Sequence, residues 1–239
     1  MIALGSGPAC GPAILGTLGA LLAVGAVPIR RIETSEPVVA ITFDACATRR
    51  KGYSFDRPVF DILKAEQVPA TVFVAGRWVE SHPDVARELA ADPLIEFGNH
   101  SWDHPHMTRL AARRMVQQIE RTETALGTVG KHGVAFRPPF GDWNRNLLAA
   151  IGDRMPVVLW DVVSGDPSRK VTAREIVRVV LRKTRAGSIV IFHINGRETK
   201  TAAALPKILR ALRARGLRFV HLSELLALHP IAEAPHARP

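Results

Sequence analysis

His100 and His104 stand four positions apart in a polar segment that follows an apolar run. Two imidazoles at this spacing can converge on one divalent cation, and a pair of solvated loop histidines is the alternative. A cation held there would polarise a carbonyl group and lower the pKa of a bound water towards about 7. The pair is therefore a candidate metal site for a hydrolytic reaction.

Groups that could exchange protons with a reacting molecule also follow apolar runs, at Asp44 and His193. Each has a structural alternative: Asp44 could cap a helix, and His193 could be a hydrogen-bonded core histidine. Arg137, which precedes two prolines, could clamp a loop. An arginine beside Asp44 would also hold that carboxylate ionised, so for Arg137 the structural and catalytic interpretations coincide.

The elements that carry these residues alternate between strand and helix. Apolar runs predict strands at 37–43, 70–75, 94–98, 134–137, 155–160, 188–192 and 217–221. Helical spacing predicts helices at 55–67, 78–91, 106–126, 143–151, 172–185, 199–215 and 223–228. Alternation favours right-handed βαβ units and a parallel sheet. We expect a single-domain α/β fold, a distorted (β/α)7-8 barrel, with a doubly wound open sheet as the competing architecture.

In parallel α/β folds the functional site lies at the carboxyl ends of the strands. Five of the predicted strands end at or just before residues able to do chemistry. These residues are Asp44, His100 with His104, Arg137, Asp161 with Asp166, and His193. The sequence therefore predicts that they gather on one rim of the barrel.

Five motifs in this order resemble the NodB-type polysaccharide deacetylases, the family 4 carbohydrate esterases. The motifs are Thr-Phe-Asp-Ala at 42–45, His-Ser-Trp-Asp-His at 100–104, Arg-Pro-Pro-Phe-Gly at 137–141, Trp-Asp at 160–161 with Asp166, and Ile-Phe-His at 191–193. The resemblance covers roughly 38–225, and the run 68–74 also resembles the family's second strand. It implies a metal-dependent hydrolase that removes acetyl groups from a glycan.

The resemblance also implies a role for each matching residue. Asp44 matches the catalytic base and His193 the catalytic acid, while Arg137 tethers the base and Asp166 orients the acid. His100 and His104 match the histidine ligands of the metal. Side chains expected to contact the substrate or wall the acetyl group are Pro139, Phe140, Trp160 and Trp102.

Two positions depart from the family's motifs. Ala45 occupies the place of the aspartate that is the third metal ligand, and Pro167 follows Asp166 where the family has tryptophan. Cys46 is a candidate replacement ligand, although adjacent residues of a strand point to opposite faces and a small buried thiol is the alternative. With two certain imidazoles we expect a weakly bound divalent metal, zinc or else cobalt or nickel.

The remaining expectations concern partners and location. The net charge of +10 fits a solvated basic surface, and because no helix-turn-helix or zinc-finger pattern occurs, nucleic acid is not an expected partner. The uncharged apolar run 13–27 suits a signal peptide or membrane anchor, so we expect an exported protein. The expected division is a leader at 1–31, a deacetylase domain at 37–228 and a flexible tail at 229–239.

These features favour a deacetylase of an envelope or exported glycan, such as a chitooligosaccharide or peptidoglycan, with an N-acetyl group as the target. A glycan-binding relative that has lost catalysis is the main alternative, because Ala45 removes a ligand. A basic nucleic-acid-binding protein is a third hypothesis, which only the charge supports.

Overall fold

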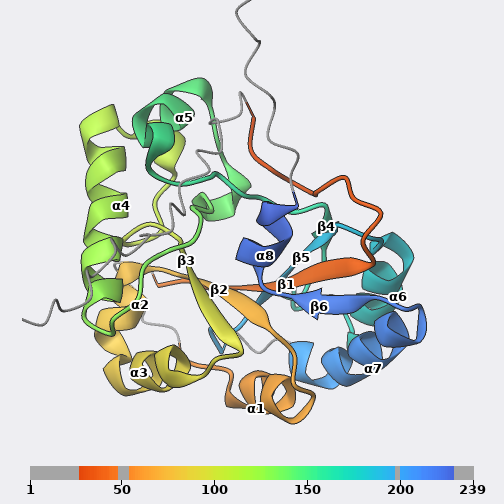
Figure 1. The fold of residues 1–239 in the computed structure, drawn as a ribbon. Coiled ribbons are helices and arrows are strands. Elements are labelled where there is room, and N and C mark those ends of the chain that lie inside the picture. The colour runs from red at the N-terminus through yellow and green to blue at the C-terminus, as the bar shows by residue number, and fades with distance from the viewer. Residues whose placement is uncertain (1–26, 48–53, 197–199, 229–239) are drawn as a thin grey trace, which may run out of the picture.

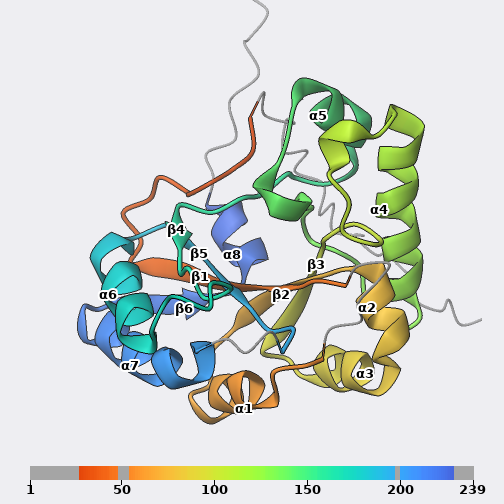
Figure 2. The same ribbon diagram turned by 180° about the vertical axis from the view of Figure 1, so that it is seen from behind.

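The computed structural model describes residues 27–47, 54–196 and 200–228. Its strands form one parallel sheet in the order β3-β2-β1-β5-β4, with β6 also paired to β1. The strands are β1 (Val38–Ala45), β2 (Ala70–Val74), β3 (Ile95–Asn99), β4 (Val162–Val163), β5 (Ile189–His193) and β6 (Arg218–Val220). In Figures 1 and 2 they occupy the middle of the molecule, and most of the helices surround them.

Isolated bridges close this sheet into a distorted barrel. Asn99 at the end of β3 pairs with Phe136, and Phe136 pairs with Val157. The chain then runs from Val157 into β4, which lies beside β5. The predicted barrel is confirmed, but the strands expected at 134–137 and 155–160 are reduced to single bridges. Prolines at 138, 139 and 156 lack the N–H that a longer ladder needs.

The helices lie close to the predicted ranges. They are α1 (Arg57–Ala65), α2 (Gly76–Ser81), α3 (Pro83–Ala91), α4 (Ala112–Gly127), α5 (Arg145–Ile151), α6 (Ala173–Lys183), α7 (Thr201–Ala214) and α8 (Leu222–Ala227). The helix predicted at 78–91 is in fact two helices, which break at His82 because the residue before a proline disfavours the helical conformation. The helix predicted at 106–126 begins as a separate 3₁₀ turn at Met107–Arg109.

Alternate residues of β1 face two different apolar layers. Val39, Ile41 and Phe43 pack in the layer beneath the helices. Val38 and Ala40 pack in the barrel interior, together with leucines of α8. Leu222 of α8 donates its backbone N–H to the Thr71 hydroxyl at the start of β2 (3.0 Å), so α8 fills the end of the barrel opposite the strands' carboxyl ends. Those carboxyl ends are where the candidate residues stand.

The folded body begins before residue 37. Ile29 donates its N–H to the Val157 carbonyl (2.9 Å), and Ile32 is completely buried. The apolar run 13–27 falls almost entirely, and the tail 229–239 completely, outside the described residues. Among the described residues, no helix has the length and apolar character needed to cross a membrane.

Candidate active site

Asp44, near the end of β1, is buried beside an equally buried arginine. Arg137 donates from one guanidinium nitrogen to Asp44 Oδ1 (2.8 Å) and from the other to the Leu159 carbonyl (3.1 Å). The guanidinium also lies over the ring of Phe73, 3.9 Å from its centre. Burial raises the pKa of Asp44, but the nearby imidazoles and Arg137 outweigh it, and the net pKa lies below its usual value. The site thus holds an ionised carboxylate.

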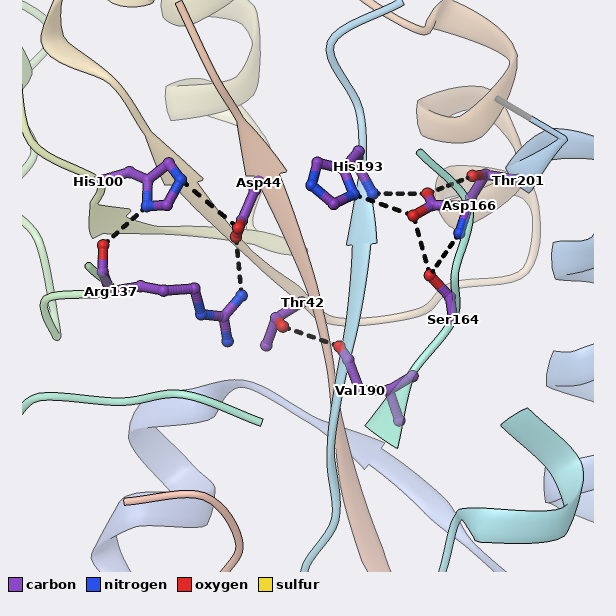
Figure 3. Close-up of polar contacts among 9 residues, drawn as sticks. All are labelled: Thr42, Asp44, His100, Arg137, Ser164, Asp166, Val190, His193 and Thr201. Carbon is purple, nitrogen blue, oxygen red and sulfur yellow. Dashed lines mark hydrogen bonds and ion pairs between the residues drawn. The ribbon is translucent and has the colours of Figure 1, made fainter. Parts of the chain in front are cut away.

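His100 follows β3 and faces the same carboxylate (Figure 3). Its Nδ1 donates to the carbonyl of Arg137 (2.7 Å), because a carbonyl can only accept. Nε2 therefore presents a lone pair, and it lies 3.5 Å from Asp44 Oδ2. Burial is the main reason that the pKa of His100 falls below its usual value, which keeps the imidazole neutral. A neutral ring fixed through Nδ1 is the form that binds metals.

The loop that carries both histidines is held by α4. Asn99 donates from its amide nitrogen to Glu123 (2.7 Å) and accepts from the Ser101 N–H (3.0 Å). Gln118 accepts from two consecutive backbone N–H groups, those of Trp102 and Asp103. These bonds tie the loop to a long helix, so the two imidazoles occupy fixed positions.

His104 completes the imidazole pair, with its ring centre 4.9 Å from that of His100. Its backbone is in the left-handed region (φ 58°), and its N–H donates to Ser101 Oγ (3.2 Å). Burial, followed by the neighbouring His100, lowers the pKa of His104 to about 3. This ring is therefore also neutral and able to bind a cation.

His193 ends β5, directly across from Asp44 in the register of β1 and β5. Asp166 binds it twice: Oδ1 accepts from Nδ1 (2.9 Å), and Oδ2 accepts from the backbone N–H (2.8 Å). Burial lowers the pKa of His193, but the hydrogen bond and charge of Asp166 outweigh it, so the net pKa is raised. His193 is thus poised to carry a proton, as an acid requires.

Two hydroxyl groups hold Asp166 in place, as Figure 3 shows. Ser164 donates to Oδ1 (2.9 Å), and Thr201, at the start of α7, donates to Oδ2 (2.7 Å). Neither residue belongs to a motif that the sequence analysis singled out. Thr201 stands 35 positions from Asp166 in an otherwise ordinary helix start. The orientation of His193 therefore depends on three elements of the fold.

Asp161 does not join the rim residues, and its predicted place there is wrong. It accepts from the Ser188 hydroxyl and from the Ile189 N–H, both at 2.9 Å. These groups stand at the start of β5, whereas His193 stands at its end. The prediction failed because the strand here is Val162–Val163 and follows Asp161. Asp166, past that strand, is correctly placed.

The residues expected to contact substrate lie in two places. Phe140 is 58% exposed, stacks on His106 (4.1 Å between centres) and meets the edge of His104 (4.5 Å). Trp160 lies 5.5 Å from the Arg137 guanidinium and close to Gly141, where an added Cβ would lie 2.9 Å from its ring. Phe140 thus borders His104, Trp160 lies beside Arg137, and Pro139, the residue before Phe140, is buried.

Trp102 lies elsewhere, although it stands between His100 and His104 in the sequence. It is buried beneath Arg121, whose guanidinium is 3.9 Å from the ring centre, and it packs close to Gly76. It also lines a pocket of about 240 Å³ beside α2 and α4. Its position indicates that it supports the loop from the helix side.

The donor atoms at this rim fit a divalent metal. Cys46 Sγ and one nitrogen each of His100 and His104 lie within 4.8 Å of one another. The lone pair on buried His100 Nε2 has no hydrogen-bond partner among the described residues. Sulfur and imidazole nitrogen are ligands that zinc prefers in proteins. The residues present therefore suit the metal that the sequence motifs imply.

Comparison with known proteins decides the family. The family model described as polysaccharide deacetylase matches residues 31–154, just over half of the 239 residues. The chain belongs to the polysaccharide deacetylase family. The chain has both motif histidines and the Asp44–Arg137 pair, and it has Ala45 where the sequence motif has aspartate.

Two curated relatives and one solved structure illustrate the range of similar proteins. A peptidoglycan-N-acetylglucosamine deacetylase of Listeria monocytogenes is 33% identical over 189 residues, which cover 78% of this chain and 38% of that protein. A chitooligosaccharide deacetylase of Rhizobium leguminosarum bv. trifolii is 30% identical over 172 residues, covering 66% of this chain and 79% of that protein. A family 4 pseudoenzyme from Bacillus anthracis matches with a TM-score of 0.75 at 26% identity, covering 84% of this chain and 69% of that one.

The chain thus spans well under half the length of the Listeria deacetylase. It resembles both proteins named as deacetylases and a pseudoenzyme of the same family. Membership in this family therefore does not establish activity, which depends on the residues of the site.

Proposed function

We propose that this protein is a metal-dependent hydrolase that removes N-acetyl groups from an envelope or exported glycan. The observation that carries the proposal is the register of β1 and β5, which pairs Asp44 with His193 beside two neutral imidazoles. A base and an acid on adjacent strands can act on the two sides of one amide bond. The relatives that act on peptidoglycan and chitooligosaccharides support this class of substrate.

Each residue has a task in hydrolysis of an acetamido group. Asp44, ionised beside Arg137, accepts a proton from the attacking water. His193 donates a proton to the departing nitrogen, and Asp166 holds its ring through Nδ1 so that Nε2 faces the reaction. Phe140 and Trp160 provide apolar surface beside the acetyl group. A divalent cation held by His100 and His104 would polarise the carbonyl oxygen and make the water more acidic.

The test is acetate release by the purified chain from N-acetylglucosamine oligomers and peptidoglycan fragments, with zinc, cobalt or nickel supplied. We expect release that stops when the metal is chelated and falls by about 10²–10⁴-fold in His193→Ala. Absence of release from every glycan with every metal would overturn the proposal.

A glycan-binding relative without catalysis is the second candidate, favoured by Ala45 and by the similarity to a pseudoenzyme. It predicts glycan binding that His193→Ala leaves unchanged, and no acetate release. The same glycan panel, measured for binding and for turnover, separates the two.

Export is also part of the proposal, and the apolar run 13–27 supports it. Such a run can be cleaved as a signal peptide or kept as an anchor. Fractionation of cells that express the full chain tests this expectation. We expect the protein in the envelope or medium, and a wholly cytoplasmic protein would contradict export.

Asp166→Asn is expected to narrow the pH range of activity. The carboxylate of Asp166 raises the pKa of His193, so the acid stays protonated to higher pH. Without that charge, burial dominates and lowers the pKa, and the alkaline limb of the kcat profile moves to lower pH. The profile of initial rates against pH measures this shift.

Asp161→Asn is the matched control, because Asp161 also accepts from a serine hydroxyl and a backbone N–H but does not touch His193. Its alkaline limb should stay at the position found in the unmodified protein. If the alkaline limb of the kcat profile lies at the same pH in the unmodified protein, in Asp166→Asn and in Asp161→Asn, then Asp166 does not set the pKa of His193.

A further inference from the structure

We infer that Cys46 is the third protein ligand of the metal, so that the site is a Cys-His-His site in place of the family's Asp-His-His site. The inference rests on the metal dependence in the proposed function, but not on turnover. It concerns which atoms hold the ion, and it can be measured whether or not the protein releases acetate.

Cys46 lies beside the two histidines of the site. Ala45 and Ala47 pack in the layer beneath the helices, so alternation turns Cys46, which lies between them, to the side of β1 that carries Asp44. Its Sγ and the nitrogens of both histidines lie within 4.8 Å of one another. Zinc bonds to sulfur at about 2.3 Å and to nitrogen at about 2.0–2.1 Å, so these three atoms border the space of a single ion.

Ala45 cannot fill the role that its place in the motif implies. Its side chain has no donor atom, and it is completely buried in the apolar layer beneath the helices. A site with three protein ligands therefore needs a donor atom from another residue. Cys46 is the next residue and is itself almost fully buried.

His100 gives an independent sign that a cation belongs here. Nδ1 is bound to the Arg137 carbonyl, so Nε2 is the ring nitrogen that is left to bind a cation. This nitrogen is buried, has no hydrogen-bond partner among the described residues and lies 3.5 Å from a carboxylate oxygen of Asp44. A cation bound at this place would give the buried nitrogen a partner.

A thiolate ligand in place of a carboxylate ligand keeps the charge of the site but changes which metals it prefers. A metal-bound thiolate carries one negative charge, as a carboxylate does. Thiolate and imidazole together favour zinc, cobalt or nickel over magnesium and manganese, which prefer oxygen ligands. The reason for expecting a weakly held metal was the lack of an anionic ligand, and a thiolate at Cys46 removes that reason.

Cobalt and zinc binding to the full chain tests the inference. The cobalt-loaded protein should show a thiolate-to-cobalt charge-transfer band in the near ultraviolet. The X-ray absorption spectrum of the zinc-loaded protein should show a sulfur neighbour at about 2.3 Å. Because loss of a partner that only orients a ligand costs roughly 10–100-fold in affinity, Cys46→Ser should weaken zinc binding at least about 100-fold and abolish the band.

Cys10→Ser is the matched control, since Cys10 is the other cysteine of the chain. It should keep both the band and the zinc affinity. The inference is overturned if the zinc-loaded wild-type protein shows only nitrogen and oxygen neighbours, if it binds no metal, or if Cys46→Ser binds zinc as tightly as wild type. The X-ray absorption spectrum of the zinc-loaded wild-type protein shows whether sulfur binds the metal, even if Cys46→Ser fails to fold.

These outcomes are separate from those of the proposed function. A sulfur neighbour without acetate release would support the Cys-His-His site and count against the hydrolase. Metal-dependent acetate release from a site without sulfur would support the hydrolase and exclude Cys46 as a ligand.

Discussion

Asp44→Asn is expected to lower kcat for acetate release by about 10²–10⁴-fold while the protein keeps its bound metal. Asparagine has nearly the shape of aspartate but cannot accept the proton of the attacking water. The side chain can still accept the hydrogen bond from Arg137, which positions it. Turnover rates and the metal content of the dialysed protein are the two measurements.

His100→Ala is the variant with which Asp44→Asn is compared, because it separates loss of a metal ligand from loss of the base. It removes the buried nitrogen that faces Asp44, so both metal and turnover should be lost. If Asp44→Asn loses its metal as fully as His100→Ala, then Asp44 is a ligand and the base lies elsewhere. A thermal unfolding curve for each variant separates these effects from loss of the fold.

The strand-end rule explains why much of the site could be predicted from the sequence. Asp44, His100 and His193 each stand at or just beyond the end of a well-formed parallel strand. The carboxyl ends of such strands meet at one rim, so residue type and position were sufficient. The assignments of particular roles came from the resemblance to the family, and the variants above test them.

The rule failed where the strand itself was misplaced. The apolar run at 155–160 looked like a complete strand, but it makes only bridges, and the ladder with β5 begins at Val162. Asp161 was therefore placed at the wrong end of β5. Sequence patterns show which residues are apolar, but they do not show where a neighbouring strand begins to pair.

Contacts between residues far apart in the sequence are the second feature of the site that could not be predicted. The alternation rule argued against Cys46 as a ligand because it took the position of Ala45 to face the metal, whereas Ala45 packs beneath the helices. Thr201 binds Asp166 although nothing in its local sequence distinguishes it. Neither contact follows from a local sequence pattern, because each joins residues of different elements.

Arg137→Met is expected to reduce the free energy of unfolding by about 3–5 kcal/mol, the largest loss of stability we predict for a single substitution. Arg137 and Asp44 are both buried, and their ion pair spans 93 positions of the sequence. Removing only the arginine leaves an ionised carboxylate in the barrel without its compensating charge. Denaturant unfolding of the chelated protein measures the effect without any contribution from a bound metal.

Arg57→Met is the matched control, because Arg57 forms an ion pair with Glu88 at the surface, where both side chains are partly exposed. Water already solvates these charges, so this substitution should cost only about 0–1 kcal/mol. A double variant, Arg137→Met with Asp44→Asn, should recover part of the stability, since it removes the uncompensated charge. If Arg137→Met costs no more than Arg57→Met, the Asp44–Arg137 pair does not stabilise the barrel, and the position of Asp44 must depend on β1 and its neighbours alone.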